Sequence, residues 1–261
     1  YIYTIEDESF VLPRPVKEGY IFSGWTGTGL SDKTMDVTVE AGSYGERTYT
    51  AHWETAYHSI KVKGKNGIDY ILSGQIGGTV TLPSTLQGET GNATVLVWFL
   101  DDGFETEITD YTVKGTANET IYAWLYTSSE PCLIQSYSDL VLLRDRVNNN
   151  SNGGRWRYGN YKLGYLDSTP LKIIVKNVKW TGIGTLPNPF EGIFDGNSGN
   201  CEVQFNEEGN ITAIDSGLFN YVGDNGTVRN VKVTGWMRPN LNSFGSIARK
   251  NSGTIEDCIF S

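Results

Sequence analysis

Only a few side chains of this 261-residue chain have the types that support catalysis or metal binding. Both histidines, His52 and His58, lie near its start, which excludes histidine-based triads, metal centres and general bases from most of the sequence. The three cysteines, Cys132, Cys201 and Cys258, show no C-x-x-C spacing, which argues against structural zinc and against a disulfide framework. The sequence therefore predicts no cofactor.

One acidic stretch has oxygen-bearing side chains at alternating positions. Asp195, Asn197 and Asn200 are of the types that bind Ca²⁺, but the stretch lacks the central glycine and the distal glutamate of an EF-hand loop. Asp and Asn also favour tight corners, because their side chains hydrogen-bond to the nearby backbone. We therefore expect a structural corner here, with a calcium site as the alternative.

A second group of residues suits binding rather than catalysis. It follows a predicted helix and combines aromatic rings with guanidinium groups, which stack on sugars or anchor a protein partner. Aromatic side chains that merely close the end of a stack of strands would give the same pattern, so both readings stay open. The group consists of Trp156, Tyr158, Tyr161, Arg155 and Arg157.

Acidic residues in the second half of the chain offer one route to enzymatic activity. A polysaccharide lyase or hydrolase needs a carboxylate pair, or a carboxylate–cation cluster, on neighbouring strands. The available groups do not recur as a pair at a regular spacing, so surface charge is their expected role. They are Asp215, Asp224, Arg229, Glu256 and Asp257.

Composition narrows the class of protein further. With 38% hydrophobic and 12% aromatic residues the chain has enough apolar surface for packed cores, and its 31 glycines and 15 tyrosines are typical of a turn-rich β protein. The 21 basic and 30 acidic residues give a formal charge of −9, which argues against nucleic acid or an anionic membrane as partner. No apolar run approaches the roughly 18 residues of a membrane span.

The elements that must position these residues divide the chain into three parts. Residues 1–56 and 57–130 share an order of strands, Leu–Pro pairs and closing aromatic strands, so we predict two copies of one small β module. Trp25 and Trp53 are expected in the core of the first copy. Residues 131–261 differ in composition and form a third domain.

The third domain shows short alternating apolar pairs separated by 30, 28 and 27 residues. One strand per repeat with Gly and Asn corners is typical of a solenoid. The spacing predicts that Val203 lies beside Val231, and Val231 beside Cys258, with Cys201 and Cys258 both buried. The pairs are Ile173/Val175, Val203/Phe205, Val231/Val233 and Cys258/Phe260.

A capping helix is predicted before the first of these strands, from Ser138 to Val147, with Ser138 as its N-cap. No cap follows the last strand. Because solenoids need their end strands covered, we expect this chain to be a fragment of a longer polypeptide that continues past Ser261.

Two runs of the first module carry a family resemblance: LPRPVKEGYIFSGW from Leu12 to Trp25, and TYTAHW from Thr48 to Trp53. With these runs the module resembles the internalin B-repeat, also called the Listeria–Bacteroides repeat. The resemblance implies a small β-grasp-like unit that occurs in tandem on bacterial surface proteins. The second module keeps only the Leu–Pro pair, Trp98 and the TIYAW ending, and is interpreted as a divergent relative.

Four short runs of the third domain carry a second resemblance: Trp180–Gly184, Phe190–Asn197, Gly217–Phe219 and Gly226–Val228. They resemble the GLUG-motif region of bacterial surface proteins, which include large adhesins and immunoglobulin-A-cleaving metallopeptidases. The resemblance implies a right-handed parallel β-helix. The chain departs from the motif at Ser198–Glu202, and it lacks the HExxH zinc motif, so the peptidase activity does not carry over.

The sequence thus predicts a mainly β protein, with two small β-grasp-like modules followed by the capped start of a right-handed parallel β-helix. Its expected function is that of a non-catalytic, adhesin-like segment on the surface or cell wall of a Gram-positive bacterium. The expected partner is a host or matrix protein or a glycan. The alternatives are a carbohydrate-active β-helix and a pure spacer, and a spacer would show no aromatic or charged patch beyond ordinary surface.

Overall fold

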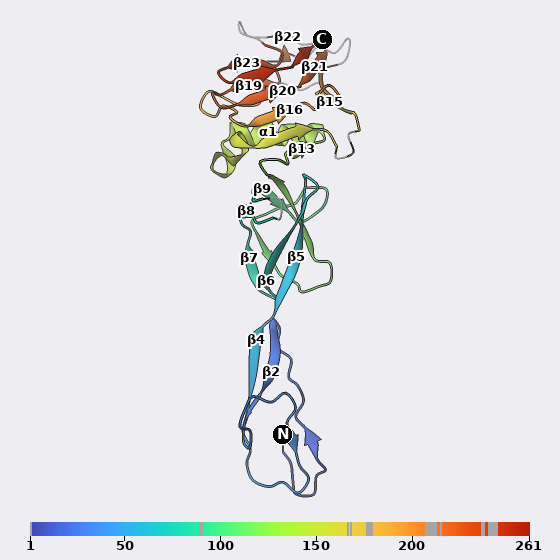
Figure 1. Ribbon diagram of the computed structural model, residues 1–261, viewed down its shortest axis with the longest axis vertical. Helices are drawn as coiled ribbons and strands as arrows, with labels where there is room; N and C mark the ends of the chain where they lie inside the picture. The colour runs from blue at the N-terminus through green and yellow to red at the C-terminus, as the bar shows by residue number, and fades with distance from the viewer. Residues whose placement is uncertain are drawn as a thin grey trace. The chain divides into compact units, whose positions relative to one another are not determined.

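The computed structural model describes residues 2–88, 91–165, 167, 169–175, 180–206, 213–214, 216–235, 238–239 and 245–261. In this part of the chain the protein is mainly β, with both antiparallel and parallel strand pairs, which confirms the predicted fold class at that level (Figure 1).

Two compact units divide residues 57–130 between them. One unit comprises Tyr1–Val62, Ile71–Leu82 and Ile108–Thr120, and the other comprises Lys63–Tyr70, Pro83–Glu107 and Ile121–Ser261.

The residues before Ala56 form two antiparallel strand pairs, β1 with β3 and β2 with β4. The strands are β1 (Phe10–Val11), β2 (Tyr20–Gly27), β3 (Thr38–Val39) and β4 (Tyr49–Thr55). A bulge in β2 lies between Phe22 and Gly24, where Gly24 has a φ of 124°. Only glycine adopts this conformation at little cost, so the bulge is specified by the sequence.

The predicted core of this segment is only partly correct. Trp25 and Trp53 are half-buried rather than enclosed, and both pack edge-on against Phe22, with ring centroids 5.3 and 5.8 Å apart. The buried aliphatic side chains here are instead Val37 and Val39. A segment this small buries little of its apolar surface, so much of its aromatic surface remains accessible to solvent.

Eight strands follow between Tyr57 and Tyr126. Strand β7 pairs antiparallel with β11, and β9 pairs antiparallel with β8 and with β12. The strands are β5 (Tyr57–Gly64), β6 (Asp69–Gln75), β7 (Thr79–Thr81), β8 (Thr85–Leu86), β9 (Ala93–Phe99), β10 (Glu107–Ile108), β11 (Asp110–Thr112) and β12 (Thr120–Tyr126).

Parallel pairing replaces antiparallel pairing from Cys132 onward. One sheet has the order β13-β14-β16-β20-β24 and a second has the order β15-β17-β21-β25, while β18 pairs with β22 and β19 with β23. Figure 1 shows these strands as successive layers that follow the chain from yellow to red. The strands are β13 (Cys132–Ile134), β14 (Asn160–Leu163), β15 (Leu171–Val175), β16 (Ile193–Asp195), β17 (Cys201–Phe205), β18 (Ala213–Ile214), β19 (Phe219–Val222), β20 (Thr227–Arg229), β21 (Lys232–Gly235), β22 (Arg238–Pro239), β23 (Ala248–Asn251), β24 (Thr254–Glu256) and β25 (Ile259–Phe260).

The predicted register is wrong between β17 and β21 and correct between β21 and β25. Val203 pairs with Val233 and not with Val231, whereas Val233 pairs with Phe260, which places Val231 beside Cys258 as expected. Side chains alternate between the two faces of a strand, so a shift of two residues leaves each one on its own face. Alternation in the sequence therefore fixes the face but not the partner.

The predicted capping helix is present as α1 (Tyr137–Asn148), and its apolar residues Leu140, Leu143 and Val147 are buried. Its N-cap is Ser136 rather than Ser138: the Ser136 side chain accepts a hydrogen bond of 3.1 Å from the backbone N–H of Asp139. Because the helix begins at Tyr137, Ser138 lies within its first turn and cannot be the N-cap.

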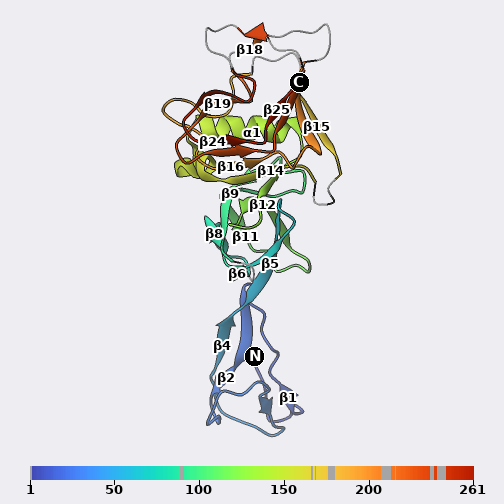
Figure 2. The same ribbon diagram turned by 45° about the horizontal axis from the view of Figure 1, so that its top comes forward.

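Figure 2 shows α1 among the strands of this region, where it contacts β15. A 3₁₀ helix, η1 (Ser151–Tyr158), follows it. No helix in the described ranges is long and apolar enough to cross a membrane.

One continuous core joins the strands of the second unit. Leu96, Phe99 and Trp124, from β9 and β12, belong to the same buried cluster as α1 and the parallel strands. Trp124 packs against Trp156 of η1, with ring centroids 5.5 Å apart. Part of the segment 57–130 therefore covers the start of the parallel layers together with α1.

Candidate binding site

Two of the aromatic residues predicted to bind a ligand are buried. Trp156 and Tyr161 are both 0% exposed, so the expectation that they lie on the surface is wrong. The Tyr161 hydroxyl donates a 2.8 Å hydrogen bond to the carbonyl of Trp156, which fixes both rings in the shared core. The alternative interpretation, in which these rings close the end of a stack, describes them better.

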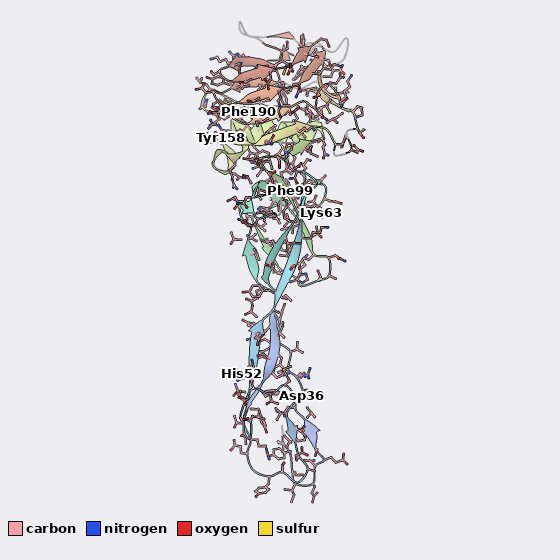
Figure 3. All side chains as sticks on the ribbon, in the orientation of Figure 1. Asp36, His52, Lys63, Phe99, Tyr158 and Phe190 are labelled. Carbon is pink, nitrogen blue, oxygen red and sulfur yellow. The ribbon has the colours of Figure 1, made fainter. Side chains whose placement is uncertain are left out.

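Both arginines of that group hold backbone carbonyls. Arg155 donates from Nη1 to the carbonyl of Val95 at 2.9 Å, and Arg157 donates from Nε to the carbonyl of Pro189 at 3.0 Å. The Arg157 guanidinium also lies over the ring of Tyr158, 5.3 Å from its centroid. Tyr158 is 55% exposed and is labelled in Figure 3, so it is the one aromatic residue of the predicted group that offers its ring to a partner.

The Asp195 corner uses its carboxylate within the fold. Asp195 accepts hydrogen bonds from the backbone N–H of Asn197 at 2.8 Å, from Arg229 Nε at 2.8 Å and from Asn230 Nδ2 at 3.2 Å. Burial opposes ionisation, but these donors together lower the pKa of Asp195. Asn197 adopts a left-handed φ of 66°, and its carbonyl accepts a hydrogen bond from the N–H of Asn200. The three candidate calcium ligands thus form a turn with its own hydrogen bonds.

Charged side chains of the parallel strands alternate in sign from layer to layer. Glu202 bridges Lys172 and Lys232, with N···O distances of 2.6 and 2.9 Å, and these three residues occupy paired positions on β15, β17 and β21. A second ladder has the paired positions Lys162, Asp195, Arg229 and Glu256 on β14, β16, β20 and β24.

These ladders place carboxylates beside cations rather than beside each other. In the residues that the structure describes, no three His, Cys, Asp or Glu side chains group so that they could hold a metal ion. Asp224 and Asp257, also considered for catalysis, are exposed, and Asp215 lies outside the described residues. The alternating pattern is that of cross-strand ion pairing, which fixes register.

A hollow in the first unit is lined by four aromatic rings. It has a volume of about 280 Å³ and brings together β1 to β4 with the segments that precede β1 and β4. Val39 is buried, whereas the other lining residues are half-buried, so aromatic faces meet solvent within a concave surface. The lining residues are Tyr3, Phe10, Leu12, Trp25, Val39, Arg47 and Tyr49.

Strand pairing explains why these rings converge. Phe10 pairs with Val39 across β1 and β3, and Tyr49 pairs with Gly27 across β2 and β4. Because glycine has no side chain, the opposite position on β2 offers nothing to cover the ring of Tyr49. The result is a concave site in which aromatic rings and polar groups contribute about equally to the exposed lining, so the polar groups can orient a ligand there.

Arg47 supplies the positive charge of the hollow. Its Nε donates to the hydroxyl of Tyr3 at 3.2 Å, and that hydroxyl donates to the carbonyl of Gly45. The hydroxyl groups of Tyr49 and Tyr3 raise the pKa of the guanidinium. No carboxylate of the described residues lies within ion-pair distance of Arg47, whereas Arg14 in the same segment forms an ion pair with Asp36 at 2.8 Å.

Sequence reasoning missed this hollow, because it placed Trp25 in a core and sought binding residues only after the helix. The TYTAHW run carried a usable signal, since Tyr49, Ala51 and Trp53 alternate on one face of β4. The contribution of Tyr3 had no such signal, because a loop brings it to the site, and β1, which carries Phe10, has two residues and so shows no alternation. No family model matches the chain, and neither a curated protein nor a solved structure aligns with it significantly.

Proposed function

We propose that this chain is a non-catalytic, adhesin-like segment of a bacterial surface protein, which presents a binding surface outside the cell. The observation that carries the proposal is the aromatic hollow with Arg47, which has no carboxylate partner among the described residues. A pure spacer would have ordinary surface, whereas a concave site with four rings and one cation has the composition of a binding site.

The two family resemblances support the same proposal. The runs that resemble the internalin B-repeat, at Leu12–Trp25 and Thr48–Trp53, include most of the paired strands β2 and β4. In the GLUG-like region, each strand of a sheet pairs in parallel with the corresponding strand of the next layer. Parallel connections are nearly always right-handed. We therefore propose β-grasp-like modules followed by a right-handed parallel β-helix.

The carbohydrate-active alternative has less support. Its chemistry requires a carboxylate pair or a free carboxylate in a groove. Asp195 instead accepts three hydrogen bonds, and Glu202 lies between two lysines. Neither carboxylate is free to abstract a proton.

A binding screen of the intact chain against host matrix proteins and glycans tests the proposed function. We expect at least one specific, saturable partner, and we expect Tyr49→Ser to weaken that binding. Tyr44→Ser is the matched control, because Tyr44 belongs to the same segment and is 84% exposed but does not line the hollow. If nothing binds, or if both variants behave like the parent, the hollow is not the binding site.

A further inference from the structure

The chemistry of the hollow restricts its ligand. Among the described residues that line the hollow, Arg47 is the only charged one, and the N–H groups of its guanidinium suit a carboxylate or a phosphate better than a neutral group. The four rings offer flat apolar faces on which another ring stacks. The ligand must therefore combine an anionic group with a ring.

Size and net charge narrow the choice. A volume of about 280 Å³ lies just under the ~300–1,000 Å³ typical of drug-sized ligand sites, so it suits one ring rather than an extended chain. Residues 1–56 contain four basic and nine acidic residues, and this excess of negative charge repels a polyanion such as a sulfated polymer. One carboxylate on a terminal ring meets the Arg47 charge with much less of this repulsion, because the repulsion grows with the number of charges on the ligand.

A peptide is a poorer occupant of the hollow. Extended peptides bind by adding a strand to an exposed sheet edge, where backbone hydrogen bonds supply much of the affinity. Strands β1 and β3 beside the hollow have two residues each and are too short to order an incoming strand. Strands β2 and β4 also border the hollow and are longer, so a peptide that bound at the hollow in place of a sugar would overturn the inference.

We propose that the hollow binds a single carboxylate-bearing sugar at the end of a glycan. This inference rests on the proposed function, for which it names the ligand class. The rings of the hollow stack on the apolar face of the sugar, while Arg47 binds its carboxylate.

Titration calorimetry on the intact chain tests the inference with three probes: sialyllactose, its neutral parent lactose, and heparin. We expect sialyllactose to bind at least ~10-fold more tightly than lactose, because a hydrogen-bonded carboxylate contributes more than a neutral group. We expect Arg47→Gln to remove most of that preference. Equal binding of lactose, or tighter binding of heparin, would overturn the inference.

Arg14→Gln is the matched control for Arg47→Gln. Both substitutions remove one positive charge from the same segment, but Arg14 is paired with Asp36, which is labelled in Figure 3, and does not line the hollow. We expect Arg14→Gln to leave sialyllactose affinity within about twofold of the parent. If Arg47→Gln unfolds at a clearly lower temperature than the parent, Arg47→Lys is used in its place. Unchanged sialyllactose affinity in Arg47→Lys would show that the guanidinium does not bind the carboxylate through two hydrogen bonds.

The two proposals fail in different ways. If the chain binds a matrix protein or a neutral glycan in the screen but not sialyllactose, the ligand class is wrong and the adhesin-like function stands. If no probe and no partner binds, both proposals fail.

Discussion

Glu119 is a carboxylate that the fold holds almost out of water, with its side chain 2% exposed. It accepts hydrogen bonds from the Tyr111 hydroxyl at 2.9 Å and from the backbone N–H groups of Lys114 and Gly115 at 2.7 and 3.1 Å, and His58 Nε2 lies 3.6 Å away. Burial opposes ionisation, but these partners lower the pKa of Glu119 below its usual 4.5. Burial and the hydrogen bond to Glu119 raise the pKa of Tyr111 to about 12.

Glu119→Gln is expected to destabilise the protein at pH 7 by about 1–3 kcal/mol, because buried donors lose a charged acceptor. A lowered folded pKa means that ionised Glu119 adds stability above its unfolded pKa, and that this contribution is lost as pH falls through the folded value. Urea unfolding at pH 7 and at pH 3 should therefore show a smaller pH dependence in the variant. The exposed carboxylate Glu18 provides the control: Glu18→Gln should change stability little at either pH.

The three thiols differ in accessibility, although Cys201 and Cys258 were both expected to be buried. Cys132 and Cys201 are buried, and burial raises the pKa of Cys132 to about 12, whereas Cys258 is only partly buried. Thiolate is the reactive form, so burial suppresses both access and ionisation. The expectation for Cys258 is wrong because β25 lies at the end of its sheet, where no further described strand covers it.

In the folded state, a chromogenic disulfide reagent should therefore label one thiol per chain, and in urea it should label three. Cys258→Ser should abolish labelling of the folded protein without changing its melting temperature by more than a few degrees. Labelling of two thiols in the folded parent would contradict the burial of Cys132 and Cys201.

At the scale of elements, one ion pair connects the turn after β5 to helix α1. Lys65 Nζ lies 2.9 Å from Asp139 Oδ1, and the two side chains are 7% and 12% exposed. Lys65 also lies over the rings of Phe104 and Trp124, 4.8 and 4.5 Å from their centroids. Asp139 accepts a second hydrogen bond from the backbone N–H of Gln135 at 2.8 Å.

Removing one partner of this pair should cost more than replacing both. Lys65→Met leaves a buried carboxylate without its cation, for which the typical cost is about 3–5 kcal/mol. The double variant Lys65→Met/Asp139→Asn should recover part of that loss, because the remaining amide needs no counter-charge. Denaturant unfolding of both single variants and the double variant measures the coupling. Additive losses would show that the two charges do not interact.

The sequence predicts an element when the pattern that specifies it lies within that element. The spacing of Leu140, Leu143 and Val147 predicts α1, because one helix face carries its own pattern. The partner of Val203 and the position of the hollow are not predictable in this way. A two-residue shift satisfies the same alternation, and Tyr3, Arg47 and Tyr49 converge only once loops have folded.

At the scale of the whole molecule, the shared core of the second unit limits where the chain can be divided. Leu96, Phe99 and Trp124 precede Pro131 yet pack in one cluster with Trp156. A chain that begins at Pro131 should therefore expose Trp156, which loses its contact with Trp124. We expect it to bind more of a hydrophobic dye than the intact protein does, and to melt well below it. A stable fragment that binds no more dye than the intact protein would show that α1 alone covers the parallel strands.

The alternating charges of the parallel layers also disfavour incorrect pairing between the strands. Every layer offers a similar backbone edge about 4.8 Å from the next, so hydrogen bonding alone does not stop a strand from pairing one layer too far along. Omitting β17 would set Lys172 beside Lys232, and omitting β16 would set Lys162 beside Arg229. Like charges at that distance repel, so a chain that skips a layer while folding meets a penalty at both ladders and is directed back to the correct order.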